Sequence, residues 1–242
     1  MSEQRSIALV LAAGRGNRFG GSKPKQLIDL CGRPLFSHAL HQHVDLGHTV
    51  IVVVSNSTRE AIVRYVAGVM PNAGIVIATG GETRGQSILA AIDAIPSDSP
   101  PETRVLLRNS VSPNTSTKLL NEVVRGLDTY DGVQAYVPSH QTAFLHRDGQ
   151  LISLYDQSSM GFTVDPTGYR LDLLTRIAET MRPAWPGETS LDIARGLGAR
   201  IGLVESPVTN IKLTTPGDLD RLSAYMSDEG DAQRRAPSSD DD

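Results

Sequence analysis

The chain has 242 residues, a formal net charge of −4 and a sequence pI of about 5.9. This length can bury the core of one α/β domain, and the acidic balance excludes a general surface for nucleic acid. A single cysteine, Cys31, excludes a disulfide within the chain, and we interpret it as a small packed residue. No apolar run is as long as a signal or membrane-spanning segment, so we expect a cytoplasmic protein without a membrane partner.

Strands and helices are predicted to alternate along the chain, which is typical of an α/β fold. The expected fold class is a Rossmann-like, mostly parallel sheet with helices on both faces and a protruding β-hairpin arm. Residues 1–228 would form one domain, and the polar segment 229–242 would be disordered. Strands are expected at Ile7–Leu11, Thr49–Val54, Ile75–Ala78, Arg104–Leu107, Val133–Val137 and Arg200–Val204. Helices are expected at Pro34–Val44, Thr58–Val69, Arg84–Ile95, Ser116–Leu127, Arg170–Met181, Leu191–Leu197 and Pro216–Met226.

The segment from about residue 139 to 166 interrupts this alternation. Thr142–Leu145 and Leu151–Tyr155 are short apolar runs separated by a turn at Arg147–Gly149, which predicts a β-hairpin arm. Two such short strands cannot bury their apolar side chains alone. We therefore expect the arm to pack against a second copy of the chain in a homodimer.

A glycine-rich loop with several cations follows the first predicted strand. Small residues let the backbone approach a ligand and turn its amides toward an anion, while basic side chains supply opposite charge. In open α/β sheets, ligands bind outside the carboxyl ends of the strands, where this loop begins. The small residues are Ala12, Ala13, Gly14 and Gly16, and the cations are Arg18, Lys23 and Lys25. The pattern predicts a phosphate site and favours a nucleotidyltransferase.

Two other phosphate-binding motifs fit this loop less well. The spacing of Gly14, Gly16 and Gly20 departs from the dinucleotide fingerprint, and no carboxylate ends the second predicted strand, which runs into Ser55 and Asn56. The kinase-type P-loop pattern is also missing from this stretch. A merely flexible turn would not explain the clustered cations.

Four sequence blocks resemble those of the methylerythritol phosphate cytidylyltransferases, over roughly residues 6 to 226. The blocks are Leu11-Ala12-Ala13-Gly14-x-Gly16-x-Arg18, Pro24-Lys25-Gln26, Gly80-Gly81-Glu82-x-Arg84-x-x-Ser87 and Asn210-Ile211-Lys212-x-Thr214-x-Pro216-x-Asp218-Leu219. Members of that family transfer CMP from CTP to a polyol phosphate with magnesium, release pyrophosphate and dimerise through a β-arm. The resemblance therefore implies CTP and a small phosphorylated alcohol as substrates and Mg²⁺ as cofactor.

The resemblance also implies roles for individual residues. The backbone of the small residues Ala12, Ala13, Gly14 and Gly16 would wrap the triphosphate. Gly81, Glu82 and Ser87 would hold the cytosine. Arg18, Lys25 and Lys212 would surround the α-phosphate as the catalytic cations, because in-line phosphoryl chemistry needs positioning and charge neutralisation above all. No protein ligand for the metal is identified.

The acceptor side departs from the family pattern after the fourth expected strand. A His-Asp-Ala-Ala-Arg-Pro block is usual there, and this chain has Arg108–Pro113 instead. Asn109 replaces a carboxylate that contacts the acceptor side, and Ser112 replaces an arginine expected to bind the acceptor phosphate. Charge-assisted hydrogen bonds to phosphate are stronger than neutral ones, so methylerythritol phosphate should bind poorly.

Further departures lie in and beside the arm. The family's Gln-Thr-Pro-Gln segment is replaced by Val164–Thr167, and the arm arginine that reaches the neighbouring subunit aligns with Gln157. Thr142 does fit the threonine of the family arm. The acceptor-binding candidates are therefore Asn109, Thr142, Gln157 and Asp165.

Three hypotheses follow from these departures. The first is a cytidylyltransferase for a different phosphorylated or phosphonylated acceptor, with Arg108 or Arg170 binding its anion. The second is a catalytically silent nucleotide-binding paralogue or partner subunit of an active cytidylyltransferase. The third is an active family enzyme with an unusual pocket. The retained cations favour the first.

Four histidines lie close together in the sequence: His38, His41, His43 and His48. His38 and His41 are one helical turn apart, which is compatible with a metal site. No cysteine or paired carboxylate completes a ligand set nearby, and apolar residues interleave with the histidines. An ordinary amphipathic helix is the preferred interpretation.

Overall fold

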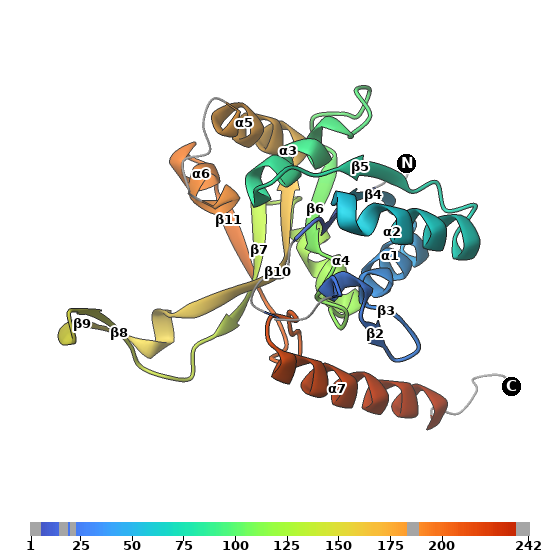
Figure 1. Ribbon diagram of the computed structural model, residues 1–242. Coiled ribbons are helices and arrows are strands. Elements are labelled where there is room, and N and C mark those ends of the chain that lie inside the picture. The colour runs from blue at the N-terminus through green and yellow to red at the C-terminus, as the bar shows by residue number, and fades with distance from the viewer. Residues whose placement is uncertain (1–5, 15–18, 20–22, 183–188, 236–242) are drawn as a thin grey trace, which may run out of the picture.

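The computed structural model describes residues 6–14, 19, 23–182 and 189–235, with side chains to 226 (Figure 1). Its centre is a 7-stranded sheet. From edge to edge the strands are β11 (Ile201–Glu205), β7 (Gly132–Pro138), β10 (Gly161–Arg170), β6 (Arg104–Asn109), β1 (Ile7–Ala12), β4 (Thr49–Val54) and β5 (Val76–Thr79). All neighbouring pairs are parallel except those of β10, so the predicted α/β fold with a mostly parallel sheet is confirmed.

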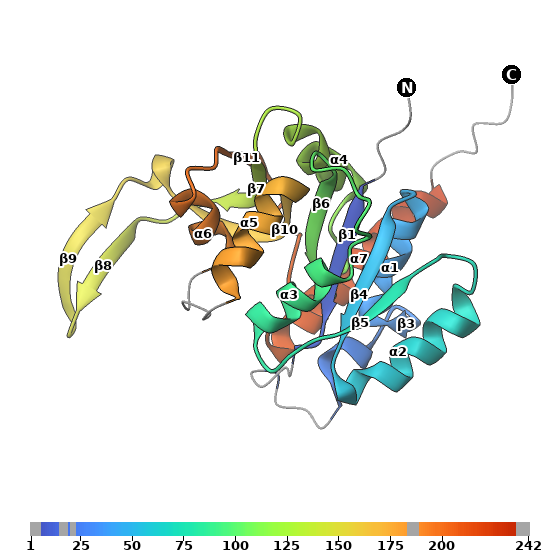
Figure 2. The same ribbon diagram turned by 90° about the horizontal axis from the view of Figure 1, so that it is seen from above.

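Helices cover both faces of this sheet (Figure 2). Alternate residues of β1 point to opposite faces, so Leu9 and Val10 belong to two different apolar clusters. Leu9 packs with α3 (Arg84–Asp93), α5 (Leu171–Met181) and α6 (Ser190–Gly196). The face of Val10 is covered by α1 (Leu35–Asp45), α2 (Asn56–Val69) and α4 (Thr117–Gly126). The six predicted helices that cover these two faces are thereby confirmed, with small shifts at their ends.

Strand β10 was not predicted from the sequence. The Asp165–Pro166 pair argues against a central strand, because proline cannot donate to a ladder. The structure accommodates the pair in an irregularity of the β10–β7 register between Thr163 and Thr167. Strand β10 thus lies between β7 and β6 and runs antiparallel to both. This insertion brings Asp165 behind the end of β6.

Two further expectations are corrected. Cys31 is exposed rather than packed, because it occupies the turn between β2 (Asp29–Leu30) and β3 (Arg33–Pro34) with φ of 53°. The C-terminal helix α7 runs over Pro216–Arg235, so residues 229–235 continue a helix where disorder was predicted. Residues 236–242 lie outside the described part of the chain. Buried Leu222 of α7 packs in a cluster with the β2–β3 hairpin.

The predicted hairpin arm is present and projects from the body of the molecule (Figures 1 and 2). It consists of β8 (Ala143–Arg147) and β9 (Gln150–Tyr155), which pair antiparallel. Asp148 and Gly149 form the turn with positive φ angles of 49° and 79°, as two-residue hairpin turns require. A short 3-10 helix, η2 (Gln157–Ser159), leads back to β10. Among the described helices, none is long and apolar enough to cross a membrane.

Candidate functional site

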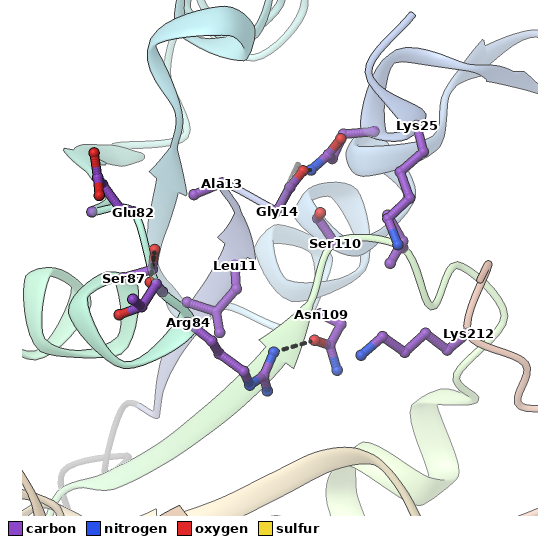
Figure 3. Close-up of a pocket in the computed structure, with 14 residues that line it drawn as sticks. Leu11, Ala13, Gly14, Lys25, Glu82, Arg84, Ser87, Asn109, Ser110 and Lys212 are labelled. Atoms are coloured by element: carbon purple, nitrogen blue, oxygen red, sulfur yellow. Dashed lines mark hydrogen bonds between the residues drawn. The ribbon is translucent and has the colours of Figure 1, made fainter. Parts of the chain in front are cut away.

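The main candidate site is a cavity of about 400 Å³ at the carboxyl ends of β1 and β6 (Figure 3). Small residues, cations and hydroxyls from segments far apart in the sequence meet there. The lining residues are Leu11, Ala13, Gly14, Lys25, Gln26, Gly81, Glu82, Thr83, Arg84, Ser87, Asn109, Ser110, Val111 and Lys212. The four sequence blocks that carried the resemblance therefore all contribute to one place.

The start of the glycine-rich loop is held by a buried glutamine. Gln26, from the 3-10 helix η1 (Lys25–Leu27), donates its Nε2 to the carbonyl of Ala12 at 3.1 Å and to that of Gly14 at 2.5 Å. These bonds fix the backbone path between strand and loop. Ala12 itself is fully buried in the core, whereas Ala13 and Gly14 line the cavity. Gly16 and Arg18 lie outside the described residues.

The opposite wall is the turn between β5 and α3. A Cβ atom on Gly80 would lie 2.7 Å from Ser87 Oγ and 2.8 Å from Ala13 Cβ, so only glycine lets this turn approach the first loop. Thr83 caps α3 in a reciprocal capping box with Gln86. The hydroxyl of Ser87 donates to the Thr83 carbonyl at 3.1 Å. The remaining predicted residues of this wall, Gly81, Glu82 and Ser87, all line the cavity.

Three described cations line the cavity against one carboxylate, Glu82. Lys25 Nζ donates to the Leu213 carbonyl at 3.2 Å, which ties η1 to the segment that carries Lys212. Lys25 and Lys212, both predicted, thus face one cavity. The third cation, Arg84, was quoted in a motif but not predicted as a site residue, because its position at the start of a helix gives no sign of where it points.

Arg84 donates Nη1 to Asn109 Oδ1 at 2.9 Å (Figure 3). Its side chain is open to the cavity but crowded by protein, and the resulting loss of hydration lowers the pKa of Arg84, which the charge of Asp165 partly offsets. Asn109, a predicted acceptor-binding residue, ends β6 and lines the cavity. A neutral amide is therefore the hydrogen-bonding partner of this cation.

Asp165 does not line the cavity. Its Oδ1 accepts hydrogen bonds from the backbone N and the Nδ2 of Asn109, both at 2.8 Å. Its Oδ2 pairs with Arg108, and its side chain is only 5% exposed. Asp165 therefore holds Asn109 from behind, and the predicted direct contact with the acceptor is wrong for this conformation.

Arg108 is fully buried and cannot bind an acceptor anion as expected. Its Nε donates to His43 Nε2 at 3.1 Å and its Nη2 to Gln42 Oε1 at 3.1 Å. Its Nη1 donates to Thr115 Oγ1 at 2.5 Å and also contacts Asp165. Burial lowers the pKa of Arg108, and the neighbouring carboxylate opposes that shift. The sequence could not show that an arginine at the end of a strand would point into the interior.

The other expected anion-binding residue, Arg170, also lies elsewhere. It pairs with Arg104 in the sheet register, at the beginning of β6, whereas the cavity lies at the end of that strand. Its Nε contacts Asp172 Oδ1 at 3.4 Å. The alternative anion-binding roles of Arg108 and Arg170 are therefore both wrong.

Two of the four histidines, His43 and His48, lie next to the buried arginine, whereas His38 contacts the Leu30 carbonyl and His41 the Tyr65 hydroxyl. Because His43 Nε2 accepts a hydrogen bond from Arg108, the ring proton of His43 is assigned to Nδ1, which donates to His48 Nδ1 at 2.9 Å. Burial, the charge of Arg108 and the neighbouring His48 hold the pKa of His43 well below its ordinary value. Within the described part of the chain, no group of three or more His, Cys, Asp or Glu side chains is arranged for a metal ion.

The two arm candidates do not reach the cavity of their own chain. Thr142 precedes β8 and Gln157 begins η2, and both are exposed. Neither belongs to the residues that line the cavity. Figure 1 shows the arm extending away from the sheet. Within one chain, the structure therefore separates these two residues from Asn109.

A cavity at the carboxyl ends of parallel strands, with a backbone loop, two lysines and an arginine, is typical of an α/β enzyme that binds a phosphorylated ligand. The sequence model of 2-C-methyl-D-erythritol 4-phosphate cytidylyltransferase matches residues 6–228. The chain belongs to this family, and its activity is CTP-dependent transfer of CMP to a small polyol phosphate with release of pyrophosphate. The family uses a divalent metal ion.

Relatives are similar over nearly their whole length. A protein of Cereibacter sphaeroides named 2-C-methyl-D-erythritol 4-phosphate cytidylyltransferase is 26% identical over 227 residues, covering 92% of this chain and 97% of that protein. Its namesake in Aquifex aeolicus is 28% identical, covering 93% and 99%. The Haemophilus influenzae protein named bifunctional ribulose 5-phosphate reductase/CDP-ribitol pyrophosphorylase Bcs1 is also 28% identical, covering 90% of this chain and 48% of that protein.

Solved structures share the fold. 4-Diphosphocytidyl-2C-methyl-D-erythritol synthase from Anaerococcus prevotii superposes with a TM-score of 0.80 at 19% identity, covering 93% of this chain and 100% of that one. The 2-C-methyl-D-erythritol 4-phosphate cytidylyltransferase from Thermus thermophilus gives 0.72 at 22% identity, covering 92% and 99%. At such identities, the likeness supports the architecture alone.

Proposed function

We propose that this cavity binds CTP with its triphosphate on the loop after β1 and its base against the turn before α3, and that the acceptor is a polyol phosphate other than methylerythritol phosphate. The observation that carries the proposal is the meeting of Gly14, Lys25, Ser87 and Lys212 in one cavity of about 400 Å³. A neutral Asn109 at its edge is what separates this acceptor end from the family pattern.

The reaction is an in-line displacement at the α-phosphorus of CTP. An oxygen of the acceptor phosphate forms a bond to that phosphorus, the bond to the bridging oxygen of the β-phosphate breaks, and pyrophosphate leaves with the electron pair. Lys25 and Lys212, together with Arg18, stabilise the charge that develops on the equatorial and leaving oxygens. Backbone amides near Ala13 and Gly14 position the triphosphate, aided by the bonds from Gln26.

The base end recognises cytosine through three residues beside the turn before α3: Gly81, Glu82 and Ser87. The backbone at Gly81 and the side chains of Glu82 and Ser87 present donors and acceptors to the cavity. The close contact at Gly80 keeps this wall at a fixed distance from Ala13. A flat pyrimidine between these walls would be held by shape as well as by hydrogen bonds.

Magnesium is the proposed metal, held mainly by the triphosphate. Mg²⁺ keeps several waters and binds through substrate phosphates and one or two carboxylates. The described lining offers one carboxylate, Glu82, and no cage of three or more ligand side chains, which fits an ion that arrives with its nucleotide. The ion would neutralise the triphosphate and align its oxygens.

The proposed assembly is a cytoplasmic homodimer formed through the arm. The arm and its base expose large apolar side chains, including Phe144 at 58%, Leu154 at 64% and Phe162 at 65%. A second copy that covers them would bring Thr142 and Gln157 of one chain toward the cavity of the other. Light scattering tests this: we expect a dimer mass for the chain and a monomer mass for Leu154→Ser/Phe162→Ser.

Pyrophosphate release tests the function. The purified full chain is given CTP, magnesium and one acceptor from a panel of methylerythritol phosphate, ribitol 5-phosphate, other polyol phosphates and small phosphonates. Ribitol 5-phosphate is included because one relative is named for CDP-ribitol. We expect release with one of the alternative acceptors and weak release with methylerythritol phosphate. Full turnover with methylerythritol phosphate would contradict the acceptor proposal. If no acceptor of the panel gives pyrophosphate release although CTP binds, a nucleotide-binding paralogue without catalytic activity is favoured.

A further inference from the structure

We propose that Arg84 is the residue that binds the anionic group of the acceptor, and that Asp165 is the positioning residue that keeps Arg84 available for it by fixing Asn109. This inference rests on the proposed function of the cavity and names the side chains that select its second substrate. It is carried by a chain of hydrogen bonds that leads from the buried Arg108 to the cavity.

The first step concerns the orientation of Asn109. Asp165 Oδ1 is 2.8 Å from both the backbone N and the Nδ2 of Asn109. A carboxylate accepts and cannot donate, so the nitrogen of the Asn109 amide must face Asp165. The amide oxygen then faces Arg84 Nη1 at 2.9 Å. The flipped amide would place oxygen against carboxylate and nitrogen against guanidinium, so Asp165 fixes one orientation.

The second step concerns charge. The Oδ2 of Asp165 pairs with Arg108, whose side chain is completely buried. Arg108 donates four further hydrogen bonds, one each to His43, Gln42, Thr115 and Ser112. Both oxygens of the Asp165 carboxylate therefore have partners, one in Asn109 and the other in Arg108. Arg84 makes no ion pair with any described residue, and the hydrogen bond it donates goes to a neutral amide.

The third step concerns what Arg84 can still bind. A guanidinium has five N–H donors, and one is used by Asn109 Oδ1. The remaining donors suit a phosphate or phosphonate, which guanidinium groups bind in a bidentate manner. Figure 3 shows Asn109 lying between the guanidinium of Arg84 and the ammonium group of Lys212. An anionic group at this end of the cavity would therefore meet a cation on each side.

The test measures ligand binding apart from turnover. The full chain is saturated with a CTP analogue that has a methylene group between its α- and β-phosphorus atoms, and ribitol 5-phosphate or inorganic phosphate is titrated calorimetrically. We expect Arg84→Gln to weaken binding of these probes by about 10- to 100-fold, the range for a lost charge-assisted hydrogen bond. Arg84→Lys should retain part of the affinity. Arg64→Gln is the matched control, because Arg64 is an exposed arginine paired with Glu60 on α2.

Affinity for the CTP analogue is measured in the same variants, to separate loss of acceptor binding from loss of nucleotide binding. We expect it to change less than about twofold in Arg84→Gln, because the inference places Arg84 at the acceptor end. Arg108→Gln/Asp165→Asn, which leaves no buried charge without its partner, should weaken probe binding as well, and a melting temperature near that of wild type would separate this effect from misfolding. Equal probe binding in wild type and Arg84→Gln, a loss confined to the nucleotide, or no binding of either probe to wild type would overturn the inference. Probe binding through Arg84 without pyrophosphate release would keep the inference and refute the proposed function.

Discussion

The two ends of the cavity are built in different ways. The nucleotide end consists of backbone and small side chains: Gly80 packs against Ala13, and Gln26 ties the first loop by two hydrogen bonds to backbone carbonyls. The acceptor end depends on side-chain charges, because Asn109 is held by Asp165, which in turn neutralises the buried Arg108. In the proposed function, nucleotide recognition would therefore rest on local geometry, and acceptor recognition on hydrogen bonds between residues far apart in the sequence.

This difference indicates which end can change during evolution. A wall built from closely packed backbone tolerates few substitutions, since a Cβ at Gly80 would overlap with Ser87 and Ala13. A charge network can be exchanged if its charges stay balanced, as the pairing of Arg108 with Asp165 illustrates. Both residues stand where the family pattern has others, so the exchange is consistent with a new acceptor on an old nucleotide site.

The largest expected effect is on the free energy of unfolding, when the buried pair of Arg108 and Asp165 is broken. Arg108→Gln leaves the Asp165 carboxylate buried without its cation, and breaking a buried pair in this way costs about 3–5 kcal/mol. Arg108→Gln/Asp165→Asn should recover most of that free energy of unfolding, as measured by urea denaturation. Arg182→Gln is the control: its partner Asp93 is exposed, so the loss should stay below about 1 kcal/mol. If the double variant is no more stable than Arg108→Gln, the loss of stability does not come from the unpaired charge of Asp165.

The next largest effect is expected on the rate of pyrophosphate release. Lys25→Ala removes a cation that lines the cavity, and we expect pyrophosphate release to fall by about 10²–10³-fold, the loss typical for one donor that stabilises developing charge. The rate is measured at saturating CTP with the best acceptor of the panel. Lys118→Ala serves for comparison, since Lys118 is 83% exposed on α4. Unchanged turnover in Lys25→Ala would remove Lys25 from the mechanism.

A smaller effect is expected at the nucleotide end. Gly80→Ala forces a Cβ to within 2.8 Å of Ala13 Cβ and 2.7 Å of Ser87 Oγ, and such overpacking costs about 1–3 kcal/mol. Affinity for CTP should fall while the Arg108 network stays intact. Gly68→Ala on α2 meets no atom within 4 Å and should instead stabilise the protein by about 0.5–1 kcal/mol. Normal CTP binding in Gly80→Ala would show that this wall is not rigid.

The smallest effect is the pH dependence of stability. The pKa of His43 lies well below its ordinary value of 6.5 because of burial, then the charge of Arg108, then His48. The unfolded chain therefore binds more protons than the folded one below that pH, and stability should fall as pH drops through 6.5 toward 5. One such proton gives a slope of at most about 1.4 kcal/mol per pH unit.

His43→Gln isolates this contribution, because a glutamine oxygen can still accept from Arg108. Melting temperatures between pH 7.5 and 5 should decline less steeply in His43→Gln than in wild type. His38, His41 and His48 also have lowered pKa values through burial, so some slope remains in the variant. Parallel curves for the two proteins would exclude His43 as a contributor.

Much of the fold could be predicted from local patterns. The apolar runs of β1 and β4 predicted buried parallel strands, and the turn at Asp148–Gly149 predicted the hairpin of the arm. Strand β10 escaped prediction because Asp165 and Pro166 interrupt its pattern, although the sheet absorbs them in an irregularity. The extension of α7 to Arg235 was also missed, since its polar end carries no periodicity.

The sequence by itself predicted the proposed nucleotide end, because Gly14, Lys25, Gly81 and Lys212 belong to the blocks that resemble the family, and all four line one cavity. Only the tertiary structure decided the acceptor end. Insertion of β10 beside β6 places Asp165 against Arg108, although 57 positions separate them. An arginine that is fully buried and one that lines a cavity look alike in a sequence. The partner that each one meets, and hence its role, depends on packing between distant segments.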